Sequence, residues 1–235
     1  MTYYNQLAVQ TNSLTIKRKK EYISYNFGKL IDKMLEDEGC HILEIGPGMG
    51  EFLDYCNGKK AFDIDIIDRD KGITEYLENT YKLASSFTSL NDFFNGKRGF
   101  YDIIMMTQVL EHIPVAEHIS IIQKLYERLS KGGVMIVTVP NIGNPLAIYE
   151  RYYDYTHETA FTEHSLEQMI DFAQLKNSSI QVQPFQIPPT SFINVIRRVI
   201  QEILHFFFKL LFMVNGGVYP RILTTNISLI IEKTA

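Results

Sequence analysis

A run of three glycines directly after a short apolar stretch constrains this chain more than any other feature. The segment reads His41-Ile-Leu-Glu-Ile-Gly-Pro-Gly-Met-Gly-Glu51. The aliphatic residues before the glycines are typical of a buried parallel strand. Glycine is required where the backbone takes positive φ or lies directly against a ligand. Because helical spacing resumes after Gly50, the segment predicts a strand, a tight turn facing a ligand, and a helix start with free N–H groups.

The spacing of the glycines separates this turn from other Gly-rich turns. The dinucleotide fingerprint places its third glycine where this chain has Glu51, and no Gly-Lys-Ser/Thr of a P-loop follows. Residues 43–50, Leu-Glu-Ile-Gly-Pro-Gly-Met-Gly, closely resemble motif I of the class I S-adenosylmethionine-dependent methyltransferases. The resemblance implies S-adenosylmethionine as the cofactor. It places four residues of the motif around that cofactor: Glu44, Gly46, Gly48 and Gly50.

Acidic and amide residues follow the next two predicted strands. Asp68 comes after the glycine turn at close to the roughly 20-residue spacing at which an acid meets a ribose diol. A carboxylate there can accept two hydroxyl hydrogen bonds at once, and Asp65 is the alternative if the strand ends early. The resemblance implies that Asn91 or Asp92, after a third strand at 87–90, holds the adenine amino group, but both residue types are also ordinary turn formers.

The segment 101–114 is a second motif, Tyr-Asp-Ile-Ile-Met-Met-Thr-Gln-Val-Leu-Glu-His-Ile-Pro. It predicts an apolar strand ending at Gln108 and a helix opened by the proline. Class I methyltransferases carry a similar Val-Leu-Glu-His-Ile segment, which implies that Gln108 touches the methionine part of the cofactor. A helix at 115–129 and a strand at 134–139 follow. The alternation predicts an α/β fold with a doubly wound, mostly parallel seven-stranded sheet and ligands at the carboxyl ends of the strands.

Residues 142–163 combine many tyrosines with charged side chains and lack a periodic pattern. They predict a substrate lid whose aromatic and polar groups suit a sugar or other polyhydroxyl acceptor. Removal of a hydroxyl proton needs a base with a pKa near 7, so His157 and His112 are the catalytic candidates, with Asp154 orienting either or acting itself. The alternatives are a helix-start residue for His112 and a turn-stabilising hydrogen bond for His157. No set of His, Asp and Glu residues has a compelling metal spacing, so no metal ion is predicted, although His112, Asp154 and His157 could converge on a divalent ion.

The lid continues into a recognisable pattern. Asp-Tyr-Thr-His-Glu at 154–158 and Phe-Thr-Glu-His-Ser-Leu at 161–166 resemble the Asp-x-Thr-His-x…Phe-Thr-x-x-Ser-Leu signature of methyltransferases found with enzymes of bacterial surface-polysaccharide assembly. The resemblance implies an O-methyltransferase acting on a hydroxyl of a sugar or saccharide precursor. Two alternatives remain open: methylation of another small molecule (quinone-like, or a phosphate-type glycan modification), and a non-catalytic subunit that binds S-adenosylmethionine.

The two ends of the chain add helices. Apolar residues at helical spacing over 22–35 predict an amphipathic N-terminal helix over the domain. The basic run Lys17–Lys20 before it is interpreted as a solvated face, with contact to an anionic substrate or membrane as the alternative. In the resembling family such helices close over the cofactor, which gives four candidate lid residues: Tyr3, Tyr4, Tyr25 and Asn26.

Strands six and seven are predicted at 180–185 and 226–233, separated by a long insertion. Within it, 192–214 is apolar nearly all round but is interrupted by charged residues, which argue against a spanning helix of roughly 20 uninterrupted apolar residues. One interpretation is a helix buried against the domain or against a second copy in a homodimer. The other is an interfacial helix that contacts the membrane peripherally.

Length and composition limit the remaining possibilities. The 235 residues suit one domain with additions. A formal charge of −4 excludes a general attraction to nucleic acid. The two cysteines form no disulfide framework and no leader is apparent, so a cytoplasmic location, extending to the inner face of the membrane, is expected. The predicted parts are an N-terminal helical cap at 1–39, a cofactor-binding core at 40–187, a hydrophobic helical insertion at 188–222, and the last strand at 223–235.

Overall fold

The computed structural model describes residues 13–36, 39–57, 59, 62–96 and 99–234. Its centre is a seven-stranded sheet with the strand order β3-β2-β1-β4-β5-β7-β6. The strands are β1 (Cys40–Ile45), β2 (Phe62–Ile67), β3 (Ser85–Phe87), β4 (Tyr101–Thr107), β5 (Leu129–Pro140), β6 (Ser178–Phe185) and β7 (Asn226–Lys233). The first five pair in parallel, and β7 runs antiparallel between β5 and β6. The doubly wound, mostly parallel sheet predicted from the sequence is confirmed.

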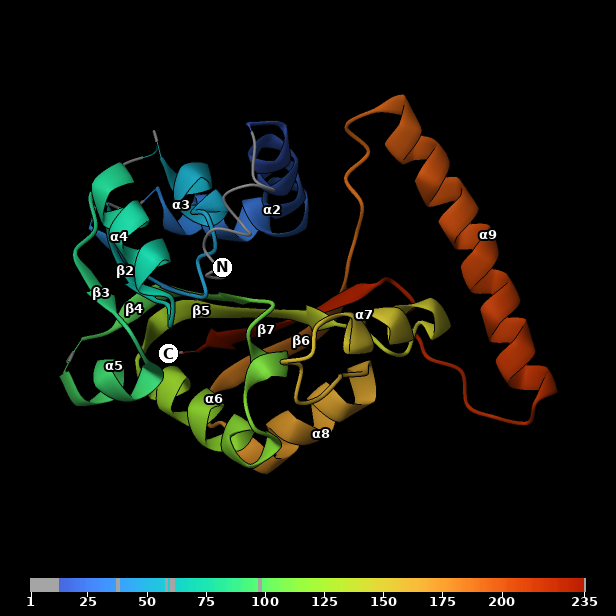
Figure 1. The fold of residues 1–235 in the computed structure, drawn as a ribbon. Coiled ribbons are helices and arrows are strands. Elements are labelled where there is room, and N and C mark those ends of the chain that lie inside the picture. The colour runs from blue at the N-terminus through green and yellow to red at the C-terminus, as the bar shows by residue number, and fades with distance from the viewer. Residues whose placement is uncertain (1–12, 37–38, 58, 60–61, 97–98, 235) are drawn as a thin grey trace.

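Helices cover both faces of this sheet (Figure 1). One face carries α2 (Ser13–Met34), α3 (Glu51–Cys56) and α4 (Lys71–Thr80), and the other carries α5 (Leu90–Gly96), α6 (His118–Glu127) and α8 (Glu163–Ala173). Short 3-10 turns, η1 (Leu110–His112) and η2 (Val115–Glu117), lead from β4 into α6. The layers leave the carboxyl ends of the parallel strands as the open edge of the fold.

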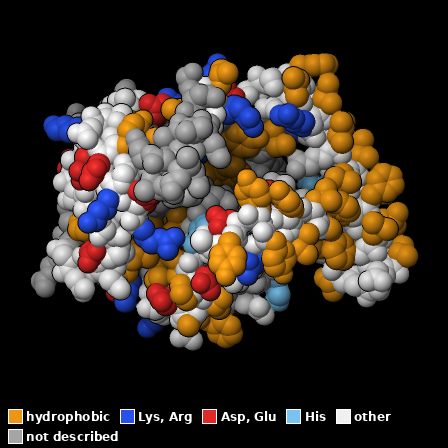
Figure 2. Space-filling view, viewed as in Figure 1, with side chains coloured by type: hydrophobic (Ala, Val, Ile, Leu, Met, Phe, Trp, Pro, Cys, Tyr) orange, Lys and Arg blue, Asp and Glu red, His pale blue; other side chains and the backbone are white. Residues whose placement is uncertain are grey.

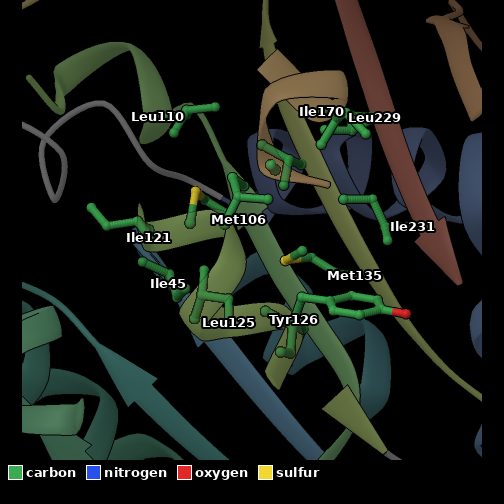
Figure 3. Packing of buried hydrophobic residues seen from close by; sticks show 14 of the residues in the cluster. Ile45, Met106, Leu110, Ile121, Leu125, Tyr126, Met135, Ile170, Leu229 and Ile231 are labelled. Atoms are coloured by element: carbon green, nitrogen blue, oxygen red, sulfur yellow. The ribbon is translucent and has the colours of Figure 1, made fainter. Parts of the chain in front are cut away.

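The central strands are buried on both faces, so consecutive residues enter different cores. On β4, Ile103 and Met105 pack with α2 and α3, whereas Ile104 and Met106 pack with α6 and α8. Figure 3 shows Met106 in this second cluster, together with side chains from neighbouring strands and from α6. This two-sided packing explains why the strands read as nearly continuous apolar runs.

Two helices lie outside these layers. α7 (Ile148–Tyr153) follows η3 (Pro145–Ala147) in the segment between β5 and α8, and α9 (Phe192–Val214) lies between β6 and β7, standing apart from the sheet (Figure 1). No residue of α9 is buried. The interpretation that this helix is buried against its own domain is therefore wrong. Within the described part of the chain, no helix has the length and apolar character needed to cross a membrane.

Helix α2 begins earlier than the periodic pattern indicated, so the basic run Lys17–Lys20 lies on it. The Lys19 Nζ is 2.6 Å from a Glu51 carboxylate oxygen, and the Lys20 Nζ is 2.8 Å from Asp54. Glu51 and Asp54 both lie on α3. Part of the basic run therefore joins α2 to the helix after the glycine turn, while Lys17, Arg18 and Lys19 remain exposed, as a solvated face predicts.

Other boundaries shift for local reasons. The third strand ends at Phe87 because Ser89 and Asp92 start α5. The Asp92 N–H donates to Ser89 Oγ at 3.0 Å, and the Ser89 hydroxyl donates to the Asp92 carboxylate. The helix predicted at 115–129 opens as the 3-10 turn η2 and ends at Glu127. The next residues already belong to β5, because Leu129 pairs with β4.

Candidate functional site

The three glycines of the turn between β1 and α3 all have positive φ: 69° at Gly46, 55° at Gly48 and 86° at Gly50. This left-handed region favours glycine. A Cβ at Gly46 would lie 2.3 Å from Val109 Cγ2, and one at Gly50 would lie 2.8 Å from the Leu77 side chain. A Cβ at Gly48 would lie 3.3 Å from the Glu51 Oε2 atom. The positive φ expected at these glycines is confirmed at all three, and packing within the protein adds a second reason for glycine at Gly46 and Gly50.

A cleft of about 1990 Å³ opens beside this turn, at the carboxyl ends of β1, β2 and β4. Ligand pockets are typically about 300–1,000 Å³, so the cleft has room for a cofactor and a second molecule. The residues predicted to bind the cofactor that line it are Glu44, Gly46, Gly48, Asp68, Asn91 and Gln108. Gly50 and Asp92 are not among the lining residues.

Two acids lie side by side on the cofactor side of the cleft. Glu44 on β1 is buried, and its Oε2 has no hydrogen-bond partner among the described residues. Burial, reinforced by the charges of Glu51 and Asp68, holds the Glu44 pKa well above its usual value. Asp68 directly follows β2, and burial raises its pKa too. Because buried carboxylates need donors, the pair fits a ligand that carries hydroxyl and ammonium groups, as S-adenosylmethionine does.

The structure separates the alternatives that the sequence left open. Asp65 lies inside β2, where its Oδ2 accepts a hydrogen bond from the buried Tyr101 hydroxyl at 2.6 Å, so it does not reach the cleft. The Asp92 carboxylate accepts hydrogen bonds from the Thr88 and Ser89 hydroxyls at 2.9 and 2.8 Å. Asn91 lines the cleft with its amide available.

Gln108 directly follows β4 in a conformation that few non-glycine residues adopt, with φ of 55°. Its N–H donates to the Thr138 carbonyl at 2.9 Å, and its Nε2 donates to Asn226 Oδ1 at 3.3 Å. Strained backbone of this kind persists where the surroundings hold it, and it clusters at functional sites. The turn at Gln108 directs the chain from β4 into the segment that lines the cleft, which includes Val109 and His112.

The acceptor end of the cleft contains a chain of hydrogen bonds through His112. The Thr156 hydroxyl donates to Asp154 Oδ1 at 2.7 Å and lies 2.9 Å from His112 Nδ1. Since the single hydroxyl proton goes to Asp154, His112 must donate from Nδ1–H, and its Nε2 carries the lone pair. Among the described residues, Nε2 has no hydrogen-bond partner. Burial lowers the pKa of His112, and the nearby His157 lowers it further, so the ring is neutral near pH 7.

Asp154 is the fixed end of this chain. Burial raises its pKa, but the hydrogen bonds from the Thr156 backbone and hydroxyl, with the nearby histidines, outweigh burial and leave the Asp154 pKa below its usual value. The carboxyl is therefore ionised at neutral pH. An ionised acceptor holds the Thr156 hydroxyl, and through it the His112 ring, in one orientation.

His157 lies behind His112, with ring centroids 4.6 Å apart. Its Nδ1 lies 3.0 Å from the Glu150 carbonyl, which can only accept, so Nδ1 carries the proton. Glu111 is fully buried beside these rings. Neither of its carboxylate oxygens has a hydrogen-bond partner within the described chain, and burial, together with the Asp154 charge, raises its pKa to about 8.

One atom from each of Glu111, His112 and His157 lies within 4.8 Å of the others. Two imidazoles and a carboxylate at this separation could hold a divalent transition metal. The sequence predicted no metal ion and offered only His112, His157 and Asp154 as residues that could converge on one. The set in the structure contains Glu111 in place of Asp154, whose carboxylate is turned to Thr156.

Sequence reasoning missed two residues of this end of the site. Thr156 and Glu111 both lie inside the motifs, but only the fold brings them to His112. The candidate lid residues Tyr25 and Asn26 hydrogen-bond Gln186 and do not line the cleft. Tyr3 and Tyr4 lie outside the described residues.

Comparisons with known proteins agree with this geometry. A family model described as a methyltransferase domain matches residues 18–180. Carboxy-S-adenosyl-L-methionine synthase of Psychrobacter arcticus (strain DSM 17307 / VKM B-2377 / 273-4) is 27% identical over 66 residues, a match that spans 26% of this chain and only 25% of that protein.

Two solved structures resemble the whole chain. A SAM dependent methyltransferase from Archaeoglobus fulgidus has a TM-score of 0.64 at 16% identity, covering 99% of this chain and 100% of that one. The plantazolicin methyltransferase BamL, in complex with a triazolic desmethylPZN analog and SAH, has a TM-score of 0.61 at 16% identity, covering 98% and 89%. At this identity the likeness shows the fold. The family match over most of the chain shows that this protein belongs to the methyltransferase domain family.

Proposed function

We propose that this protein transfers a methyl group from S-adenosylmethionine to a hydroxyl of a sugar or saccharide precursor of a bacterial surface polysaccharide. The observation that carries the proposal is the neutral His112 ring. Its Nε2, at the acceptor end of the cleft, has no hydrogen-bond partner in the described part of the chain, and its Nδ1 is held through Thr156 by Asp154. That arrangement suits removal of a proton from an acceptor hydroxyl.

The cofactor is S-adenosylmethionine, which supplies a methyl group on a sulfonium. Gly46 and Gly48 offer bare backbone to it, and Asp68 offers a carboxylate to its ribose hydroxyls. Glu44 provides the buried acceptor oxygen at the floor of the cleft. Asn91 and Gln108 line the cleft at the positions expected for the adenine and the methionine part.

Methyl transfer to a hydroxyl is an in-line displacement, so the protein must align the acceptor oxygen and remove its proton. Alignment of two reactants in one cleft supplies a large part of the rate. His112 Nε2 would take the hydroxyl proton as the new O–C bond forms and the methyl–sulfur bond breaks, which leaves the sulfur as a neutral thioether. The resulting imidazolium lies within reach of the charge of Asp154, which stabilises it. The His157 ring lies at a tilt of 58° to the His112 ring and is anchored on the Glu150 carbonyl, so it limits the positions that His112 can take.

The lid supports a polyhydroxyl acceptor. Tyr153, Asp154, Tyr155 and Thr156 line the cleft, and both tyrosines are exposed. Tyrosine rings with polar neighbours pack against the apolar face of a sugar ring and bind its hydroxyls. The lid is joined to the His112 turn, because the Glu158 N–H donates to the Glu111 carbonyl at 2.8 Å. Acceptor binding on the lid would thus affect the position of His112, the proposed base.

The test combines binding and turnover. Isothermal titration should show that the wild type, His112→Ala and His157→Ala bind S-adenosylmethionine alike, while transfer of a labelled methyl group to extracted glycan falls at least about 100-fold in His112→Ala. His164→Ala is the matched control, because His164 is exposed on α8 and pairs with Glu167. It should retain activity.

Other results would favour the alternatives. Cofactor binding with no transfer to any acceptor would indicate a binding subunit. Transfer to a quinone or to a glycan phosphate, with none to a sugar hydroxyl, would reassign the acceptor. Normal acceptor kinetics in His112→Ala would remove this residue from the mechanism.

A further inference from the structure

Helix α9 is amphipathic, but its polar side faces the protein. The positions that are only half exposed, and so turned toward the domain, are Asn194, Arg198, Gln201, His205, Phe208, Lys209 and Phe212. The exposed apolar positions are Phe192, Ile193, Val195, Ile196, Val199, Ile200, Ile203, Leu204, Phe206, Phe207, Leu210, Leu211, Met213 and Val214. A surface helix of a globular domain normally has the opposite orientation, with its apolar stripe against the core.

Specific contacts hold α9 in this orientation. The Arg198 guanidinium donates to the Tyr25 hydroxyl at 2.6 Å and to Gln186 Oε1 at 3.2 Å, and it also lies over the Tyr25 ring. The Asn194 amide donates to the Pro188 carbonyl at 2.9 Å. These contacts lie on the polar side, so the outward direction of the apolar side is built into the fold.

The exposed apolar surface of α9 is large. Figure 2 shows hydrophobic side chains along the length of α9. Further exposed apolar side chains lie on η3 and α7: Leu146, Ile148, Tyr149 and Tyr152. Contiguous apolar patches larger than a few hundred Å² are rare on free soluble proteins and mark a surface that is covered in use.

We propose that α9 lies in the surface of an anionic lipid bilayer, with its apolar side among the acyl chains. The helix has 23 residues and is about 34 Å long. Its apolar side spans about half of the circumference, from Val195 on one flank to Leu204 on the other. Pairing with a second α9 would bury a narrower seam and leave both flanks in water. A bilayer surface contacts half of a helix lying in it.

The charged residues of α9 agree with an anionic lipid bilayer as the surface that covers its apolar side. No charged residue falls among the exposed apolar positions. Arg197 follows at one border of the apolar side, where a long basic side chain reaches lipid phosphates, and Glu202 follows at the other border. Lys209 lies on the half-exposed side, with its Nζ over the Tyr219 ring. Glu202 is the acid of the helix, against three basic residues when Arg198 is included. Basic residues on the polar side, opposite a side rich in phenylalanine and leucine, characterise interfacial helices.

Placing α9 in the bilayer surface also determines where the cleft lies relative to the membrane. Arg198 contacts Tyr25 of α2 and Gln186, which follows β6, and the same two segments contribute Tyr22 and Phe185 to the cleft lining. A bilayer that holds α9 therefore also holds the cleft near the lipid surface. An acceptor carried on a lipid would reach the cleft without leaving the membrane.

Flotation of the full chain with vesicles tests the proposal. We expect the protein to float with vesicles of phosphatidylglycerol and phosphatidylethanolamine, and more weakly with phosphatidylcholine alone or at high salt. Phe206→Asp should lower the partition coefficient by about tenfold or more. Phe172→Asp is the matched control: Phe172 is 69% exposed on α8 and Phe206 is 63% exposed, so general surface hydrophobicity would affect both variants alike.

A second measurement does not depend on the aspartate variant. The chain contains no tryptophan, so Phe206→Trp carries a single reporter. Its emission should shift to the blue with anionic vesicles and be quenched by brominated acyl chains, whereas that of Phe172→Trp should not change. Titration with S-adenosylmethionine without lipid should give the same affinity in every variant, which keeps this test separate from that of the methyl-transfer proposal.

Three results would overturn the proposal. They are absence of flotation with every anionic composition, equal loss in the Phe206 and Phe172 aspartate variants, and a Phe206→Trp spectrum that vesicles leave unchanged. A stable dimer in analytical ultracentrifugation that Phe206→Asp dissociates, without vesicle binding, would show that a second copy covers the face.

Discussion

Replacing Gly46 with alanine should destabilise the protein by about 2–5 kcal/mol. A left-handed backbone costs an alanine roughly 1–2 kcal/mol, and φ at Gly46 is 69°. The added Cβ would lie 2.3 Å from Val109 Cγ2, a contact that forces displacement and costs about 1–3 kcal/mol as overpacking. Chemical denaturation followed by circular dichroism measures the free energy of unfolding.

Two control variants separate the backbone part of this destabilisation from the overpacking part. Gly132 has φ of 78° and nothing within 4 Å of its ideal Cβ, so Gly132→Ala should cost only the backbone part, about 1–2 kcal/mol. Val109→Ala removes Cγ2. Made together with Gly46→Ala, it should recover the overpacking part, which a double-mutant cycle reports as a coupling energy.

The reasoning fails if Gly46→Ala costs no more than Gly132→Ala, or if the Val109 and Gly46 substitutions are additive. The glycine would then be required by the ligand and not by its protein neighbour. Titration with S-adenosylmethionine would show that case directly, as a loss of affinity without loss of stability.

Three further predictions concern the acids and the metal set. Asp68→Ala should weaken S-adenosylmethionine binding by about 10- to 100-fold in calorimetry, because hydrogen bonds to a carboxylate are lost. Asp92→Ala should leave the affinity nearly unchanged. Equal effects of the two substitutions would contradict the assignment of Asp68 to the ribose. Burial raises the pKa of Glu111 from 4.5 to about 8, so the folded protein keeps a proton that the unfolded chain releases between these values. The free energy of unfolding should therefore fall as pH rises through this range, and Glu111→Gln should flatten that slope in denaturation at several pH values. A chelator should leave methyl transfer unchanged; a loss that added divalent cations restore would show that His112 and Glu111 bind metal.

Local chemistry in the sequence determined the sheet and the cofactor side of the site. Apolar runs ending in glycine, in Asp68 and in Gln108 each specify a strand and the residue at its carboxyl end. Parallel strands bring those ends to one edge whatever the loops do. The resemblance of residues 43–50 to motif I therefore correctly predicted the methyltransferase fold. Boundaries moved where a cap such as Ser89 with Asp92 competed with strand propensity.

The acceptor side depended on contacts that no local pattern contains. Thr156 and Glu111 meet His112 only because the lid folds back on the turn after β4, and the protonated nitrogen of His112 follows from that meeting. The direction of α9 was likewise undetermined. Periodicity shows that a helix has two sides, but only the contacts of Arg198 with Tyr25 and Gln186, residues distant in the chain, decide which side faces the protein.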